Sequence, residues 1–438
     1  MTDIEFGGLL FGVCLVLIAL RMPVAIAMFA VGGFGFSVLA GWPALLGLLN
    51  TGPFGRTSGY TLSVLPLFLL MGQFATRAGL GRSLFDSARA WMGHRRGGLA
   101  ISTVFGCAAF GSICGSSFAT AATMASVAMP EMRRSGYSGA LATGSLAAGG
   151  TLGILIPPSV ILVIYAIITE QSVGKLFFAA LVPGVIATLG YSVAVSVYVR
   201  LNPASAPVVP AAPFRERVRS LRLVVPVAAI FLMVIGGIYL GVFTPTEGAA
   251  IGAAATLLLA SMSGRMNWAG FVSSLLETAQ VTAAIFLILI GAEVYNGFLA
   301  LTRIPIELAN AFADSGLAPM SILIGILLVY LILGCVMDSL AMILLTVPVF
   351  FPLVTGLEFG LTEEEIAIWF GILTLIVVEV GLITPPIGLN VYVINSLADD
   401  VPLGESFRGV FPFLLSDFVR VAIILAVPAT CLWLPGLL

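Results

Sequence analysis

A polar, glycine-rich interruption of an apolar segment occurs twice in this chain, about 222 residues apart, and it constrains the fold more than any other feature. The first copy spans residues 111–117 (GSICGSS) and the second spans residues 334–339 (GCVMDS). Each copy is followed by a hydrophobic segment that a double proline breaks, at residues 153–158 (GILIPP) and 381–386 (GLITPP). Duplicated, interrupted hydrophobic segments at corresponding positions are typical of the binding region of secondary transporters.

The composition predicts a membrane protein. Of the 438 residues, 60% are hydrophobic and 9% are charged, and the mean hydropathy is +1.14. Such a chain has too little polar surface to cover a soluble globule, so we expect an all-α polytopic membrane protein. The first apolar run, residues 6–20, continues into Arg21 and Pro23 rather than a cleavage site, which predicts a retained span. The five cysteines are irregularly spaced in apolar segments and predict neither disulfides nor a metal cluster.

About ten segments have the length and apolarity of a membrane span. They are residues 5–21, 23–40, 60–77, 138–169, 175–200, 222–240, 243–262, 280–302, 366–398 and 405–437. Two other apolar stretches are predicted to be re-entrant hairpins. The stretch 97–132 has arms too short to cross and basic residues at both ends, which places both ends in the cytoplasm. The stretch 317–354 has acidic residues on both sides, and both of its ends are expected outside.

The charge distribution predicts the orientation. With a periplasmic N-terminus, the cytoplasmic loops collect 15 of the 19 basic residues, in keeping with the positive-inside rule. Each half then has five crossings and one hairpin, and an odd number of crossings gives the halves opposite orientations. We therefore predict an inverted repeat. Its parts are a first repeat at 1–201 with a broken helix at 138–169, a cytoplasmic linker at 202–221, and a second repeat at 222–438 with a broken helix at 366–398.

The interruptions carry the chemistry. Non-helical backbone at membrane depth leaves carbonyl and amide groups free. Carbonyl oxygens with a hydroxyl or a carboxylate suit an alkali cation, and helix N-termini attract an anion. The first predicted cation site consists of Ser112, Ser116, Gly153, Ile156 and Pro158. The second consists of Gly334, Asp338, Gly381, Thr384 and Ile387. Asp338 is the only carboxylate at either interruption, and an intramembrane carboxylate is a functional candidate by default.

Other polar residues have two interpretations each. The candidate substrate contacts are Ser117, Thr120, Ser339 and Asn390. For Ser117 and Thr120, a hydrogen bond to a preceding carbonyl of the same helix is as good an explanation. The intramembrane Glu379 could serve packing or be protonated. Asp417 and Arg420 are three residues apart on one helix and are predicted to form a structural pair, at a subunit contact.

The motifs together resemble the large membrane subunit of tripartite ATP-independent periplasmic (TRAP) transporters. The similarity covers essentially the whole chain and rests on residues 111–116, 156–159, 334–338 with the prolines 348 and 352, and 384–390. The resemblance implies an elevator-type importer in the bacterial inner membrane that is coupled to at least two sodium ions. Both hairpins and both broken helices would form the moving transport domain, and the remaining spans the scaffold.

The resemblance also implies partners. These are a small four-helix membrane subunit, which we expect not to be fused to this chain, and a periplasmic protein that delivers an organic acid. No nucleic-acid partner and no enzymatic activity are expected. A stand-alone sodium/dicarboxylate symporter is the nearest alternative. An intramembrane protease is a weaker one, because the only histidine, His94, lies in a basic loop and an aspartyl dyad would require Asp338 to meet Asp417.

Overall fold

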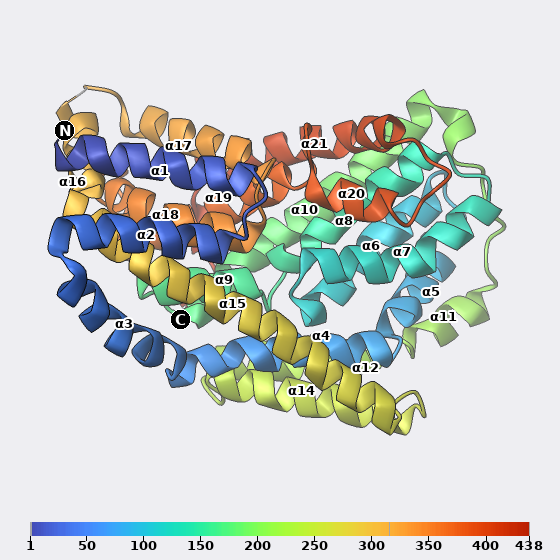
Figure 1. Ribbon diagram of the computed structural model, residues 1–438. Coiled ribbons are helices and arrows are strands. Elements are labelled where there is room, and N and C mark those ends of the chain that lie inside the picture. Colours follow the sequence, from blue (N-terminus) through green and yellow to red (C-terminus); the bar gives the residue numbers. More distant parts are fainter. Residues whose placement is uncertain (1, 315, 438) are drawn as a thin grey trace.

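The computed structural model describes residues 2–314 and 316–437, and this part of the chain is helical almost throughout (Figure 1). The first half contains α1 (Asp3–Ala19), α2 (Val24–Ala40), α3 (Trp42–Thr57), α4 (Val64–Arg77), α5 (Leu80–Met92), α6 (Gly98–Cys114), α7 (Ser117–Arg134), α8 (Gly139–Leu155), α9 (Val160–Thr169) and α10 (Val173–Leu201). The second half contains α11 (Phe214–Leu221), α12 (Val225–Phe231), α13 (Gly237–Tyr239), α14 (Pro245–Met262), α15 (Trp268–Thr302), α16 (Ile304–Asp314), α17 (Pro319–Gly334), α18 (Ser339–Thr355), α19 (Glu363–Gly381), α20 (Leu389–Asn395), α21 (Leu403–Ala426) and α22 (Ala429–Leu432).

Local sequence explains where many of these helices begin. The N-terminus of α14 has a capping box, in which the Thr244 hydroxyl accepts from the backbone N–H of Glu247 and the Glu247 carboxylate accepts from Thr244. The same arrangement of Thr362 and Glu365 begins α19. The hydrogen bonds from the backbone and the hydroxyl of Thr362 hold the pKa of Glu365 below its usual range. These caps satisfy amide groups that would otherwise lack partners at the helix ends.

Two helix pairs have the same construction in the two halves. The pair α6 and α7 is interrupted at Gly115 and Ser116, and the pair α17 and α18 is interrupted between Gly334 and Ser339. In each half the pair is followed by a broken helix, α8 with α9 in the first and α19 with α20 in the second. Figure 1 shows α17 and α18 at one end of the molecule and α6 and α7 at the other, with their interruptions turned towards the middle.

The centre of the molecule is formed by α8 and α19. Residues 140–155 of α8 are all buried, and so are residues 366–381 of α19. A helix that is apolar on every side suits either lipid or the interior of a protein, and the burial of α8 and α19 places them in the interior. Around α8 lie α6, α7, α10, α20 and α21, while α17, α18 and α21 pack on α19. The buried centre therefore holds both hairpin-like pairs against both broken helices.

The outer helices approach one another through small residues. A Cβ atom on Gly32 of α2 would lie 2.6 Å from the Cα of Tyr295 on α15, and one on Gly291 would lie 2.5 Å from the carbonyl oxygen of Ala25. Glycine at these positions lets α2 and α15 pack backbone to backbone, as is common between membrane helices. Large apolar side chains such as Phe34 and Val38 remain exposed on α2, as expected for a surface that faces lipid.

The spans differ in detail from the ten expected. Within the described residues, four helices are long and apolar enough to cross a membrane, and the number rises to as many as six if each of two bent pairs counts as one span. The segment α3 was not expected, and α4 bends by 62° into α5. The helix α15 begins at Trp268, where Asn267 caps it, instead of at residue 280. The earlier start was not predicted because Ser273 and Glu277 lower the hydropathy of the first turns.

Candidate functional site

The first interruption brings α6 and α7 onto the break of α8. Gly115 has φ +65°, a left-handed conformation that favours glycine, and it ends α6. Ser116 then takes an extended conformation and caps α7 by accepting a hydrogen bond from the Ala119 amide at 3.4 Å. A Cβ on Gly115 would lie 2.8 Å from the carbonyl oxygen of Pro158. The backbone of Gly115 therefore contacts Pro158, and the predicted member Ser116 is the next residue in the chain.

A pair of glycines forms the crossing between α6 and α8. A Cβ on Gly111 would lie 2.5 Å from the Cα of Gly153, and one on Gly153 would lie 2.8 Å from the carbonyl oxygen of Ser116. The next residues of α8 leave the helix, with Ile156 extended and the peptide bond between Pro157 and Pro158 in cis. The carbonyl of Ser116 and the break in α8 are therefore close neighbours, as a shared ligand set requires.

The second interruption repeats this geometry with a carboxylate. Asp338 caps α18, and its Oδ1 accepts from the Ala341 amide at 3.0 Å. A Cβ on Gly334 would lie 3.1 Å from the Cα of Gly381, and one on Gly381 would lie 2.6 Å from the backbone of Gly334. Asp338 and Ser116 thus occupy equivalent capping positions beside equivalent glycine crossings. Both side chains are half-buried.

Two of the predicted hydroxyl ligands donate to their own helices. Ser112 donates to the carbonyl of Ala109 at 2.8 Å, and Thr384 donates to the carbonyl of Val380 at 2.6 Å. These bonds occupy the hydroxyl protons and leave oxygen lone pairs free to accept or to bind a cation. The remaining predicted member, Ile387, lies half-buried in the turn between α19 and α20. Its side chain is apolar, so only its backbone carbonyl could serve as a ligand.

The predicted substrate contacts differ in their surroundings. Ser117, Thr120 and Asn390 are fully buried. The Ser117 hydroxyl and both polar atoms of the Asn390 side chain make no hydrogen bond within the described part of the chain. Asn390 lies on α20, which packs against α7, the helix that carries Ser117. Buried polar groups without partners are uncommon and require a water, an ion or a ligand to satisfy them.

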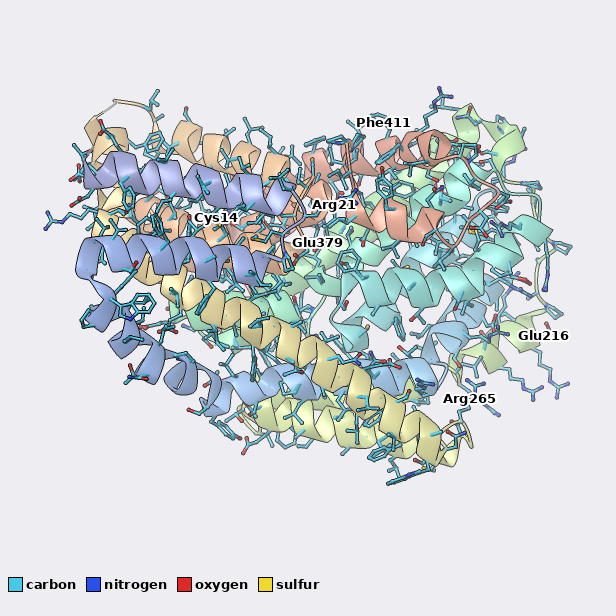
Figure 2. All side chains as sticks on the ribbon, viewed as in Figure 1. Cys14, Arg21, Glu216, Arg265, Glu379 and Phe411 are labelled. Atoms are coloured by element: carbon cyan, nitrogen blue, oxygen red, sulfur yellow. The ribbon has the colours of Figure 1, made fainter. Side chains whose placement is uncertain are left out.

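Ser339 has a protein partner that sequence reasoning missed. Its hydroxyl donates to Oε1 of Glu379 at 3.0 Å, and both residues are buried. Figure 2 places Glu379 in the middle of the molecule. The bond joins the residue directly after Asp338 to α19 two residues before Gly381. Glu379 therefore holds the start of α18 at the glycine crossing. This hydrogen bond gives Ser339 a structural role, which the predicted substrate contact did not include.

A second buried polar cluster lies beside the first. The Asp417 carboxylate and the Arg420 guanidinium approach to 2.7 Å on α21, and their side chains are only 1% and 3% exposed. The Tyr191 hydroxyl donates to Asp417 at 2.8 Å and lies 3.2 Å from the Thr151 hydroxyl of α8. The predicted pairing is confirmed, and it lies in the interior of the chain, where it joins α8, α10 and α21. Tyr191 gave no sequence signal, since a tyrosine in an apolar helix is ordinary.

Two clefts separate the hairpin-like pairs from the outer helices. One has a volume of about 630 Å³ and lies between α15 and α18, with Glu293, Asn296 and Pro348 on its walls. The other also has a volume of about 630 Å³ and lies between the turn joining α4 and α5 and the helix α7, with Thr123 and Arg265 on its walls. Because α7 and α18 are the second helices of their pairs, the clefts occupy related places in the two halves.

Within the described residues, no group of three or more His, Cys, Asp or Glu side chains is placed to hold a metal ion. The donors at the interruptions are carbonyl oxygens, hydroxyls and a single carboxylate, which suit hard cations of low charge.

Comparison with known proteins assigns this arrangement to a family. The family model described as "Tripartite ATP-independent periplasmic transporter, DctM component" matches residues 11–430. The chain belongs to the family of TRAP transporter large permease subunits. Members of this family are membrane transport proteins, so the chain is a permease and not an enzyme, and the intramembrane protease is excluded.

Individual TRAP permeases are similar over most of their length. The C4-dicarboxylate TRAP transporter large permease protein DctM of Pseudomonas aeruginosa is 39% identical over 384 residues, covering 87% of this chain and 88% of that protein. The sialic acid TRAP transporter large permease protein SiaM of Vibrio cholerae is 31% identical, with 87% and 88% covered. The ectoine/5-hydroxyectoine permease UehC of Ruegeria pomeroyi is 30% identical, with 92% of each chain covered.

The fold of this TRAP permease is also similar to a solved structure. The Alcanivorax borkumensis YdaH transporter matches with a TM-score of 0.58 at 14% sequence identity, over 90% of each chain. At this identity the match shows the fold alone. It supports an all-helical polytopic transporter architecture, while the number of crossings and the direction of the repeats stay predictions from the charge pattern.

Proposed function

We propose that this TRAP permease imports an organic acid by sodium-coupled secondary transport. The observation that carries the proposal is the repeated crossing, in which Gly111 meets Gly153 and Gly334 meets Gly381. Each crossing places a helix N-terminus, capped by Ser116 or Asp338, beside broken backbone. Such a place supplies carbonyl ligands for a cation and a positive helix end for an anion.

The proposed cation is sodium, and oxygen donors of this kind are compatible with it. The side chains of Ser116 and Asp338 already accept hydrogen bonds from backbone amides, and their oxygens have further lone pairs. The second site would have one formal negative charge and the first would have none. At least two ions of unequal affinity are therefore proposed to bind with the substrate.

The substrate class follows from the relatives and from the free polar groups. The similar permeases are named for C4-dicarboxylate, sialic acid and ectoine. No basic residue lies within the two interruptions or their double-proline segments. The carboxylate of a bound substrate would therefore contact helix N-termini, Ser117 and Asn390 rather than a lysine or an arginine. The bound cations would then supply positive charge.

The proposed movement is that of an elevator. The two helix pairs and the broken helices share the buried centre, while α2, α4, α14 and α15 pack on one another outside it. The clefts beside α18 and α7 separate these two groups of helices in part. A boundary of this kind can slide without disrupting the centre. A small four-helix subunit would stiffen the outer group, and a periplasmic binding protein would deliver the substrate.

Asp338→Asn tests the sodium site. Asparagine caps helices about as well as aspartate, so the substitution removes the charge and keeps the start of α18. The Coulomb attraction between a carboxylate and a cation about 4 Å away is ~4 kcal/mol at an effective dielectric constant of about 20, so the half-saturating sodium concentration should rise by at least about tenfold. Ser116→Ala and Thr384→Ala should have smaller effects. Uptake by Asp338→Asn with an unchanged sodium requirement would show that the second site is misplaced.

Cysteine labelling tests the proposed orientation. Asp86 on α5 is exposed, and Glu364 is exposed at the start of α19, where it pairs with Lys175. A membrane-impermeant thiol reagent should reach Asp86→Cys only from the cytoplasm and Glu364→Cys only from the periplasm. Labelling of both positions from the same side contradicts the inverted repeat.

The stand-alone symporter is tested by reconstitution. The purified chain in liposomes with a sodium gradient should be silent until the small subunit and the substrate-loaded binding protein are both added. Robust uptake of free substrate by this chain alone would favour the symporter.

A further inference from the structure

The short helix α11 is the most basic segment of the chain. Its sequence, FRERVRSL, is followed directly by another arginine. The α11 arginines are Arg215, Arg217, Arg219 and Arg222. Four positive charges therefore stand against the single negative charge of Glu216. Figure 2 places Glu216 at the outer edge of one end of the molecule.

The α11 arginines have no carboxylate partner among the described residues, in contrast to several arginines elsewhere in this TRAP permease. Arg77 pairs with Glu277, and Arg89 pairs with Glu131. Among the ion pairs of the described residues, none includes an α11 arginine. Arg217 donates its Nε to the carbonyl of Ala212, which leaves its charge uncompensated. Unpaired arginines that gather on one short helix form a binding surface for an anionic partner.

An apolar strip accompanies this charge. Phe214, Val218 and Leu221 are 72%, 47% and 45% exposed. Their spacing of four and three residues places them on one face of the helix. A helix with an exposed apolar face and flanking arginines matches the interface between lipid headgroups and acyl chains.

The helix is held in a fixed place on the protein. Trp91 of α5 donates its indole N–H to the carbonyl of Arg217 at 3.0 Å, and the hydroxyls of Ser87 and Ser220 lie 3.4 Å apart. Figure 1 shows α11 beside α5, at the end of the molecule where α6 begins and α7 ends. The apolar helix α12 follows α11 after three residues, and residues 214–239 together have the length and apolarity of a membrane span.

We propose that α11 is a binding site for anionic phospholipid headgroups. The α11 arginines contact the phosphate groups, and Phe214, Val218 and Leu221 enter the boundary of the acyl chains. A nucleic acid or an acidic protein would satisfy the charges but would leave the apolar strip in water. Continuity with an apolar membrane-spanning segment puts the headgroup layer within reach. Because α5 packs against α6 and α7, a lipid bound at α11 also fixes the support of the first helix pair.

Lipid titration of the purified full-length chain tests the proposal. The delipidated protein in a neutral detergent is titrated with phosphatidylglycerol and, separately, with phosphatidylcholine of the same acyl chains, and bound lipid is counted by native mass spectrometry. One basic residue near a membrane surface contributes about fivefold in affinity, so Arg215→Gln/Arg219→Gln should lose up to about 25-fold for phosphatidylglycerol. The matched control Arg95→Gln/Arg96→Gln removes two exposed loop arginines and should keep the preference.

The other arms separate the alternatives. Phe214→Ser should weaken both lipids by similar factors, because the apolar strip does not distinguish headgroups. Thermal unfolding of each variant should match that of the wild type, since the altered side chains are exposed. Equal wild-type binding of the two lipids, an equal loss in the control variant, or displacement of phosphatidylglycerol by inorganic phosphate at the same concentration would each overturn the proposal.

Discussion

The ion pair between Asp417 and Arg420 offers the sharpest test of the buried centre. Arg420→Met keeps the apolar stem and removes the guanidinium. The Asp417 carboxylate, 1% exposed, would then retain only the hydrogen bond from Tyr191. Breaking a buried pair in this way costs about 3–5 kcal/mol, because one charge stays buried without compensation. Asp417→Leu should cost a similar amount and should also leave the Tyr191 hydroxyl without its acceptor.

The double variant separates charge from packing. Asp417→Leu/Arg420→Met removes both charges, and apolar replacement of a buried pair is often neutral or stabilising. The orphaned Tyr191 hydroxyl still costs about 1–3 kcal/mol, reduced where Thr151 continues to bond it. Adding Tyr191→Phe should recover most of that loss. We therefore expect the double variant to be more stable than either single variant, and the triple variant to be near wild type.

The measurement is the fraction of monodisperse protein that survives heating in detergent, read by size-exclusion chromatography for all variants. The order should be wild type and triple variant first, then the double variant, then the two single variants. If the losses of the single variants simply add in the double variant, the two side chains are not coupled. The argument from the buried pair would then be wrong.

Two further predictions concern the second crossing. Gly381→Ala places a Cβ 2.6 Å from the backbone of Gly334 and should lower the free energy of unfolding by about 1–3 kcal/mol. The control Gly325→Ala on α17, where the new Cβ has nothing within 4 Å, should be neutral or mildly stabilising. The two variants are compared by their survival on heating. Ser339→Ala should raise the sodium concentration needed for half-maximal uptake. Glu379→Gln should change that concentration little, because a carboxamide oxygen still accepts the hydrogen bond from Ser339. A larger effect of Glu379→Gln would show that the charge of Glu379, and not this hydrogen bond, affects sodium dependence.

The places where helices break were accessible from sequence because local rules decide them. A glycine in the left-handed region ends α6, and Ser116 and Asp338 are strong capping residues. Double prolines cannot continue a helix, so the ends of α8 and α19 follow from residues 157 and 385. Each of these decisions uses neighbours within a few residues, and none requires knowledge of the tertiary fold.

The partners across the fold were not accessible in the same way. Ser339 bonds Glu379, 40 residues later, and Tyr191 bonds Asp417, 226 residues later. A hydroxyl in an apolar helix gives no sign of which distant helix will face it. The early start of α15 was missed for a related reason, since Glu277 lowers the hydropathy of its first turns and finds its partner in Arg77 of α4. Long-range pairing therefore hid both the network and the length of a helix.

The two interruptions show why charge can differ between repeats while geometry cannot. Serine and aspartate are nearly equivalent as caps, so exchanging Ser116 for an acid, or Asp338 for a hydroxyl, changes helix stability little. The glycine crossings have no such freedom, because a Cβ at Gly153 or Gly381 would meet backbone of the facing helix. The fold therefore fixes where the carbonyl groups meet and leaves the capping side chain to set the charge. If the proposed sodium ions bind at both interruptions, the site with Asp338 is expected to bind its ion more strongly and to fill before the site with Ser116.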